Sequence, residues 1–330
     1  MQKTIREVDQ ERGIVQITVA DERWYMKPST SETSGIPTYK GVPSVTWKAS
    51  YYPKGVGYYK WLGEHGWDES QALMREAGDK GSRVHLAVEK IIAGEEFRID
   101  TKVADKSIGM ELELSYDELV CVKSFCDWRA EMEQEYLIET VRSETVVFSE
   151  KHDYAGTIDW IVRLTPKAEG KNPLKLAGPT IFVVDFKTSQ QVWTSAEMQV
   201  SAYKKALESG ENPIKLLNDN GTETGEMMDV TNIRVAILQL GYKLNKKYFK
   251  FTEVDDCFDM FLVSSKIWER EVGKQEVKVV DFPIVLSAGK PKPEAAVEPE
   301  VPEQSTLPEL EIPSAAVELP KPKKAAGVSA

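Results

Sequence analysis

The period of the hydrophobic positions changes several times along the chain, and each change marks a predicted element. Over residues 1–40 apolar and polar residues alternate, as in GIVQITVADERWYM, which predicts a β-rich N-terminal region that ends in the turn-rich SETSGIP. The next segment reads GVPSVTWKA, where Pro43 and Ser44 are suited to open a short helix.

Two helices are predicted after this region. From Glu69 to Ala93 the apolar residues recur with the period of an α-helix, and Gly78 and Gly81 are the positions most able to interrupt it. A second helix is predicted over residues 116–136, because its apolar residues fall on one face.

Five strands and two helices are predicted after residue 139. The strands cover Thr140–Phe148, Tyr154–Leu164, Thr180–Lys187, Asn232–Leu240 and Tyr248–Thr252. The helices cover Ser195–Glu208 and Asp255–Val272. Helices that alternate with β-branched strands in this order predict an α/β fold built on a mixed sheet.

Composition sets limits on the class of protein. The 330 residues are 41% hydrophobic, enough for one large domain with extensions. No apolar run reaches about 18 residues, and MQKTIREVDQERG lacks an apolar signal core, so we expect no membrane partner and a cytoplasmic protein. The three cysteines, Cys121, Cys126 and Cys257, have neither disulfide-framework nor metal-site spacing.

The formal net charge of −11 argues against a general polyanion binder. Any contact with a nucleic acid would therefore depend on local lysines and bound cations. The predicted turn between the last two strands and the strand that follows it carry four lysines, which form either a basic patch or an ordinary solvated hairpin. These lysines are Lys243, Lys246, Lys247 and Lys250.

The composition changes again near residue 288. Beyond it Pro, Ala, Glu and Lys alternate without an aromatic residue, and eight of the 17 prolines lie there. Such a segment cannot bury enough apolar surface to offset its ordering entropy, so 288–330 is predicted to be a disordered tail. The tail is either simply solvated or docks a partner protein.

Charged residues on apolar strands are the main indication of chemistry. Asp159 and Asp185 each lie in a β-branched run, and Lys187 follows Asp185 by two positions, so these last two side chains share one face of a strand. Two carboxylates and an ammonium on such strands are costly to bury unless they pair or bind a metal. This arrangement suits metal-dependent cleavage of a phosphodiester.

Two helices add polar pairs spaced four residues apart, which places each pair on one helical face. His85 and Glu89 form the first pair, and Gln199 and Tyr203 the second. Taken singly, each of these residues has an ordinary structural explanation, such as a surface salt bridge or a packed aromatic ring. Their order along the chain and their strand and helix contexts carry the prediction.

The ordered series GSRVH, GTID, VVDFK and Gln199-x-x-x-Tyr203 resembles the PD-(D/E)XK nuclease superfamily, in particular its RecB-like branch and the phage-type exonucleases. The resemblance spans residues 43–252 and lies in the combination of motifs. It implies a restriction-endonuclease-like fold, with a mixed central β-sheet flanked by helices. The nuclease domain would cover residues 41–287, between a β-rich lead-in (1–40) and the tail (288–330).

The same resemblance implies roles for single residues. His85, Asp159 and Asp185 would be ligands of Mg²⁺ or Mn²⁺, and Asp159, Asp185 and Lys187 would be the catalytic residues. Lys187 would polarise the attacking water or neutralise developing charge. No nucleotide cofactor is expected, because the chain lacks a GxxxxGK[ST] phosphate loop.

Further roles implied by the resemblance concern the DNA. Gln199 and Tyr203 would be DNA-binding residues near the backbone, and Glu144 stands where the family often has another acidic residue. Several RecB-like relatives hold an iron–sulphur cluster with four cysteines. This chain has three, so no such cluster is expected.

These observations favour a metal-dependent deoxyribonuclease, specifically an exonuclease in phage or prokaryotic DNA recombination, repair or processing. It would act in the cytoplasm, that of the host if the protein is phage-encoded. Its partners would be DNA and a recombinase, a single-strand-binding protein or a separate helicase. Two alternatives stay open: a structure-selective or nicking endonuclease on the same fold, and a non-catalytic DNA-binding or scaffold protein with a nuclease-like fold.

Overall fold

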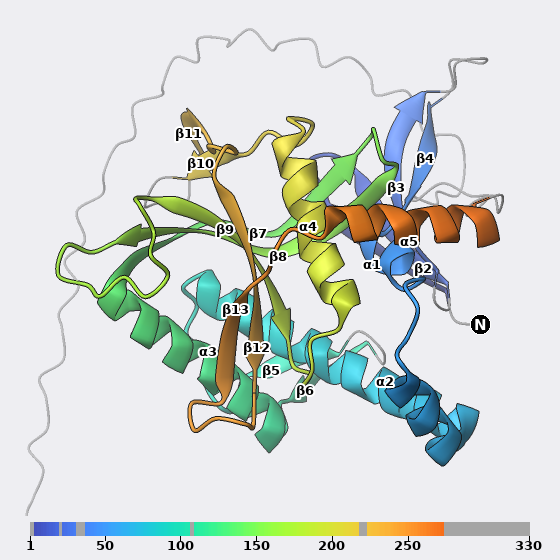
Figure 1. Ribbon diagram of the computed structural model, residues 1–330, viewed down its shortest axis with the longest axis horizontal. Coiled ribbons are helices and arrows are strands. Elements are labelled where there is room, and N and C mark those ends of the chain that lie inside the picture. The colour runs from blue at the N-terminus through green and yellow to red at the C-terminus, as the bar shows by residue number, and fades with distance from the viewer. Residues whose placement is uncertain (1–2, 20–21, 31–36, 106–108, 218–222, 274–330) are drawn as a thin grey trace, which may run out of the picture. The chain divides into compact units, whose positions relative to one another are not determined.

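A five-stranded mixed sheet forms the centre of the protein (Figure 1). This computed structural model describes residues 3–19, 22–30, 37–105, 109–217 and 223–273. The strand order is β13-β12-β9-β8-β7, with β12 parallel to β9 and the other neighbours antiparallel. The strands are β7 (Tyr136–Ser149), β8 (Tyr154–Pro166), β9 (Thr180–Lys187), β12 (Ile233–Leu240) and β13 (Phe249–Glu253).

Helices cover both faces of this sheet, which confirms the predicted α/β class. One face packs against α1 (Val45–Ala49), α4 (Thr194–Glu208) and α5 (Phe258–Glu271), and the other against α2 (Val56–Ile92) and α3 (Tyr116–Glu135). The alternation along β9 explains the two layers. Ile181 and Val183 join the first hydrophobic cluster, whereas Phe182, Val184 and Phe186 join the second.

The first of the helices that precede the central sheet begins where its sequence predicts, and the second begins earlier. Ser44 caps α1, because its Oγ accepts a hydrogen bond from Trp47 N at 3.1 Å. The long helix α2 begins at Val56 rather than at Glu69, since Gly66, with φ 73°, joins two helical stretches across a kink. Gly78 and Gly81 lie within α2 and do not interrupt it.

The β-rich N-terminal region is a four-stranded antiparallel sheet, with order β1-β2-β3-β4. Its strands are β1 (Lys3–Asp9), β2 (Ile14–Val19), β3 (Glu22–Thr30) and β4 (Pro37–Pro43). The last strand runs across the expected domain boundary between residues 40 and 41. The sheet packs on β7 and β8 through one small hydrophobic cluster, which contains Ile14, Tyr25, Val42, Val146, Phe148 and Ala155.

Two short hairpins were missed by the sequence prediction. They are β5 (Lys102–Asp105) with β6 (Met110–Glu113), and β10 (Lys215–Leu217) with β11 (Glu223–Met227). Their strands are only three to five residues long and most of their described side chains are exposed, so they give no apolar alternation long enough to reveal a strand. The predicted disordered tail, 288–330, lies outside the described residues. Within the described ranges, no helix is long and apolar enough to cross a membrane.

Candidate active site

The two aspartates lie on neighbouring antiparallel strands, Asp159 on β8 and Asp185 near the end of β9. The register, in which Trp160 pairs with Val184, places the aspartates opposite each other where the ladder ends. Phe186 N donates a hydrogen bond of 2.8 Å to Asp159 Oδ2, which fixes this carboxylate against β9. Asp185 is only 2% exposed. The strand pairing therefore brings together two carboxylates that are 26 positions apart in sequence.

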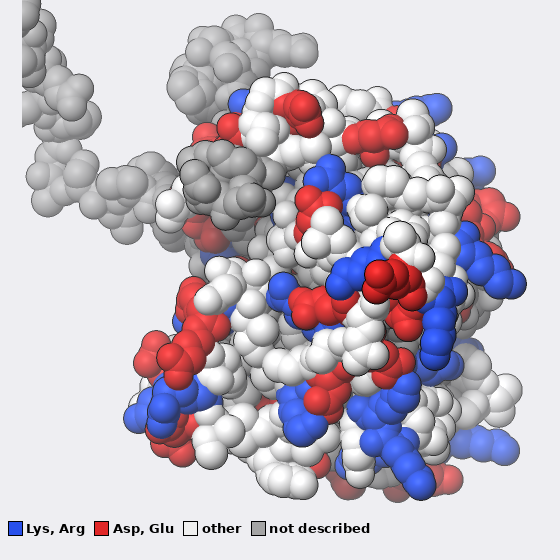
Figure 2. Space-filling model, turned by 90° about the vertical axis from the view of Figure 1, so that its left-hand side faces the viewer, with Lys and Arg blue, Asp and Glu red and all other residues white. Residues whose placement is uncertain are grey.

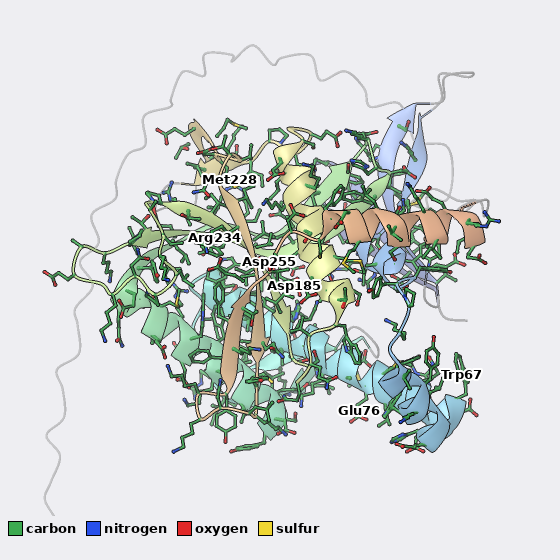
Figure 3. All side chains as sticks on the ribbon, in the orientation of Figure 1. Trp67, Glu76, Asp185, Met228, Arg234 and Asp255 are labelled. Carbon is green, nitrogen blue, oxygen red and sulfur yellow. The ribbon has the colours of Figure 1, made fainter. Side chains whose placement is uncertain are left out.

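Lys187, Gln199 and Tyr203 converge on Asp185, which lies beside α4 in Figure 3. Lys187 Nζ lies 2.6 Å from Asp185 Oδ2. Gln199 Nε2 donates to Asp185 Oδ1 at 3.0 Å and to the Tyr203 hydroxyl at 2.9 Å, and Gln199 Oε1 accepts from Lys187 Nζ at 3.5 Å. The i,i+4 pair on α4 thus orients the carboxylate and the ammonium together.

The glycine of the GTID segment is needed for this packing. A Cβ on Gly156 would lie 2.4 Å from Tyr203 Cε1 and 3.0 Å from its hydroxyl oxygen. Because contacts this short do not occur, any side chain at Gly156 would displace the Tyr203 ring and the hydrogen bond it receives from Gln199.

His85 reaches the same place from α2. Its Nε2 lies 3.0 Å from the Phe186 carbonyl oxygen, and its Nδ1 lies 3.6 Å from Asp159 Oδ2. An Nε2–H donor satisfies the carbonyl, and a second proton on Nδ1 would face the carboxylate. The structure therefore brings His85 together with Asp159 and the backbone of the β9 end.

Glu144 faces Asp159 from β7. The register pairs Ser143 with Trp160 and Thr145 with Ile158, so Glu144 lies opposite Asp159. Its backbone has φ 47°, a left-handed conformation that is unfavourable for a residue with a side chain. Strain of this kind concentrates at functional sites, which fits a further charged group in this location.

Burial and neighbouring charges separate the pKa values of the three acids. Burial raises the pKa of Asp185 to about 6, although Lys187 opposes the shift. Burial, with the Asp159 charge adding to it, raises the pKa of Glu144 to about 7. Burial would also raise the pKa of Asp159, but His85 and Lys187 outweigh it and lower that pKa below its usual value. Acids with such divergent properties are typical of active sites.

The pKa values of the two basic groups, Lys187 and His85, are raised by the neighbouring carboxylates. Burial lowers the pKa of Lys187, but Asp185 and Asp159 outweigh it, so the pKa is raised and the ammonium form is favoured. Burial lowers the pKa of His85 as well, yet the charge of Asp159 raises it above the usual value. The site is therefore a compact array of paired opposite charges.

The atoms that could hold a divalent cation are oxygen and nitrogen donors of the kind such ions prefer. They belong to Asp159, Asp185, His85 and the Phe186 carbonyl. Asp185 Oδ2 is buried and, beyond its ion pair with Lys187, accepts no hydrogen bond from the described residues. Among those residues, no group of three His, Cys, Asp or Glu side chains is arranged to hold a metal ion. The assignment of His85, Asp159 and Asp185 as ligands therefore stays a prediction.

These side chains line a cleft of about 1530 Å³. Small-molecule sites typically enclose about 300–1,000 Å³, so the cleft has room for part of a polymer. The N-terminal sheet lines it too, which the sequence prediction missed. The alternation in GIVQITV and ERWYM carries the signal, because it sets polar side chains on one face. These cleft residues are Arg6, Gln16, Thr18, Arg23 and Tyr25.

The lysine-rich turn after β12 does not line this cleft. Lys247 pairs with Glu131 of α3 at 2.5 Å, and Lys243 lies 3.9 Å from Asp117 at the start of the same helix. On the face shown in Figure 2, basic and acidic side chains are interspersed. The turn therefore has the contacts of a solvated hairpin with local ion pairs.

No protein-family model matches the chain, and no curated protein matches it. The function is therefore argued from the residues of the site itself.

Proposed function

We propose that the protein is a divalent-metal-dependent deoxyribonuclease, an exonuclease that hydrolyses DNA phosphodiester bonds in phage or prokaryotic recombination, repair or processing. One observation carries the proposal: Asp159, Asp185 and Lys187 meet where the pairing of two adjacent strands ends, inside a cleft too large for a typical small molecule. The enzyme would act in the cytoplasm, that of the host cell if it is phage-encoded.

Asp159, Asp185, His85 and the Phe186 carbonyl would hold Mg²⁺ or Mn²⁺. The buried Asp185 Oδ2 fits such a role, because its one partner among the described residues is the ammonium of Lys187. A buried anionic oxygen with so few partners is costly, and a bound cation would compensate it. When bound, the cation supplies an acidified water and neutralises charge on the phosphate.

The chain's own residues provide the remaining parts of the reaction. Lys187 Nζ is held between Asp185 Oδ2 and Gln199 Oε1, from where its positive charge can stabilise the charge that develops on the phosphate. Gln199 fixes the Asp185 carboxylate, and the Phe186 amide fixes that of Asp159. Preorganised groups of this kind lower the barrier because they need little rearrangement during the reaction.

The proposal is tested with purified protein and end-labelled linear duplex and single-stranded DNA, in Mg²⁺ or Mn²⁺ and in EDTA. We expect metal-dependent cleavage that Lys187→Ala reduces at least about 1,000-fold, the size typical of losing a transition-state contact. Lys250→Ala is the matched control, since this lysine lies on β13 outside the cleft. Intact DNA in every metal, or full activity in Lys187→Ala, would overturn the proposal.

The mode of cleavage is decided on covalently closed circular DNA. An exonuclease needs an end and leaves the circle intact, whereas a nicking endonuclease opens it. A non-catalytic DNA-binding protein would bind both substrates and cleave neither, and Asp185→Ala would not alter its binding.

A further inference from the structure

One face of the N-terminal sheet is polar and turned toward the catalytic cleft. In β2 and β3 the pairs Gln16–Tyr25 and Thr18–Arg23 are cross-strand neighbours, and β1 adds Arg6 opposite Gln16. Residues two apart on a strand share a face, so all five side chains lie on the same side of the sheet. All five also line the cleft that contains Asp159 and Asp185.

A chain of hydrogen bonds fixes this face to the catalytic sheet. Gln16 Nε2 donates to the Tyr25 hydroxyl at 2.9 Å, and this hydroxyl lies 3.0 Å from Thr157 Oγ1. Thr157 precedes Asp159 by two positions on β8, so it projects on the same side of the strand. Tyr25 is 2% exposed and belongs to the hydrophobic cluster between the two sheets. The position of the N-terminal sheet relative to the active site is thus defined by buried contacts.

Of the two arginines on this face of the sheet, Arg23 is the one available to a ligand. It is exposed and forms no ion pair within the described part of the chain. It also lies within electrostatic range of the site: burial and Arg23 lower the pKa of Lys187, while Asp185 and Asp159 raise it. Arg6 is less available to a ligand, because its Nη2 lies 3.9 Å from Glu144 Oε2.

The balance of charge in the cleft differs from that of the whole protein. The full chain has a net charge of −11, but the cleft is lined by more basic than acidic residues. The basic ones are Arg6, Arg23, Arg75, Lys80 and Lys187, and the acidic ones are Asp79, Glu144, Asp159 and Asp185. An exposed guanidinium beside paired carboxylates suits a phosphate diester, which Arg can bind through two parallel hydrogen bonds.

We infer that the polar face of the N-terminal sheet is a second wall of the substrate site, on which Arg23 binds a backbone phosphate of the DNA next to the scissile bond. This inference rests on the proposed function and assigns it a substrate-binding residue. Arg23 contacts a phosphate that does not react, so it stabilises the ground state and the transition state equally. Its loss therefore raises KM and leaves kcat nearly unchanged.

The test uses the full-length protein and a linear DNA oligonucleotide. For Arg23→Ala we expect KM for cleavage to rise about tenfold, as for a lost charge-assisted hydrogen bond, with kcat changed less than threefold. In Ca²⁺, used in place of Mg²⁺, fluorescence anisotropy should show the same rise in Kd. The slope of log Kd against log salt should fall in magnitude by about 0.7–0.9, the value for one phosphate contact.

Two further variants serve as controls. Arg270→Ala removes another exposed arginine, from the last turn of α5 and outside the cleft, and should change KM less than twofold. Arg23→Lys keeps the charge and loses the paired hydrogen bonds, so it should recover part of the affinity and restore the salt slope.

The outcomes separate this inference from the proposed function. If the wild type cleaves DNA and Arg23→Ala has the same KM and Kd as Arg270→Ala, only the inference about Arg23 is overturned. If the wild type binds DNA without cleaving it, and Arg23→Ala binds DNA tenfold more weakly, the result supports the second wall of the substrate site and overturns the proposed nuclease activity. Wild-type protein that neither binds nor cleaves DNA overturns both.

Discussion

Two buried charge clusters branch from the same helix, two residues apart. Arg83 of α2 extends to Asp105 at the end of β5 and to Glu118 of α3, whereas His85 extends to Asp159 and the end of β9. In the first cluster Arg83 Nε and Nη2 contact Glu118 Oε1 at 2.8 and 2.6 Å, and Nη1 contacts Asp105.

The two clusters differ in how their acids are satisfied. Ser115 caps the start of α3 and donates to Glu118 Oε2 from both its amide and its hydroxyl, at 2.7 and 2.6 Å, so both Glu118 oxygens are hydrogen-bonded. In the second cluster the buried Asp185 Oδ2 meets only the Lys187 ammonium, at 2.6 Å, among the described residues, and the pKa of Asp185 is raised to about 6 by burial.

The difference shows what each cluster contributes. A buried ion pair whose groups are all hydrogen-bonded holds secondary-structure elements together, here α2, β5 and α3. A buried acid in an open cleft, with one oxygen that meets only a partly exposed lysine, contributes little to the stability of the fold and is available to a ligand. Removing charge should therefore harm stability in the first cluster and activity in the second.

The largest effect on folding is expected for Arg83→Met. It removes the guanidinium that pairs with the buried carboxylates of Asp105 and Glu118, which should lower the free energy of unfolding by about 3–5 kcal/mol. Urea unfolding measures this value. The folded fraction of the variant should cleave DNA at the wild-type rate, because Arg83 does not line the cleft.

Asp185→Asn is the matched variant in the other cluster. It should change the unfolding free energy by less than about 1 kcal/mol, because it removes a charge that burial disfavours and leaves the partly exposed Lys187 to water. Equal destabilisation by the two variants would contradict the distinction between the clusters.

A smaller effect, with a defined pH dependence, is expected for Glu144→Gln. The pKa of Glu144 is raised from 4.5 to about 7. An acid with a raised pKa in the folded state stabilises the protein below its unfolded pKa, and this contribution is lost as the pH rises from about 4.5 through about 7. Glutamine avoids the loss, so the variant should be more stable than the wild type at pH 8 and not at pH 4.5.

The gain at pH 8 should be about 1–2 kcal/mol, less than the shift alone implies, because the Glu144 side chain is 27% exposed and solvent screens it. Thermal unfolding in EDTA at several pH values measures it. Glu226→Gln, an exposed position on β11 outside the cleft, is the control. A difference from wild type that does not grow with pH would show that Glu144 is ordinarily solvated.

Much of the central sheet and the relation between Asp185 and Lys187 could be predicted from sequence. A β-branched run is a local signal, and a spacing of two on a strand or four on a helix fixes which side chains share a face. The Gln199–Tyr203 pair on α4 follows from the same rule, and the structure brings it onto Asp185.

The wall of the cleft that the N-terminal sheet forms could not be predicted in this way. The hydrogen bond between Tyr25 and Thr157 joins residues 132 positions apart, and the contact of His85 with the Phe186 carbonyl spans 101 positions. Periodicity states which face of an element is polar, but not which other element that face meets. The role of Arg23 therefore required the packing of two sheets.

The smallest effect is expected for Tyr203→Phe, which tests how far the second cluster depends on supporting groups. The change removes only the hydroxyl that accepts from Gln199 Nε2 at 2.9 Å and keeps the ring against Gly156. Gln199 still donates to Asp185, so the carboxylate loses only part of its orientation. We expect kcat to fall about three- to tenfold, as for one net hydrogen bond, with KM nearly unchanged.

Tyr154→Phe is the control for this last variant. Its buried hydroxyl donates to the Ala202 carbonyl at 2.8 Å and does not line the cleft, so its loss should lower stability by about 1 kcal/mol and leave kcat unchanged. If Tyr203→Phe instead lowers kcat by roughly two orders of magnitude or more, its hydroxyl contacts the substrate directly, since one supporting hydrogen bond is too weak for such a loss. Equal kcat values for the two variants would mean that Asp185 is held by Gln199 alone, and that Tyr203 serves the core in the same way as Tyr154.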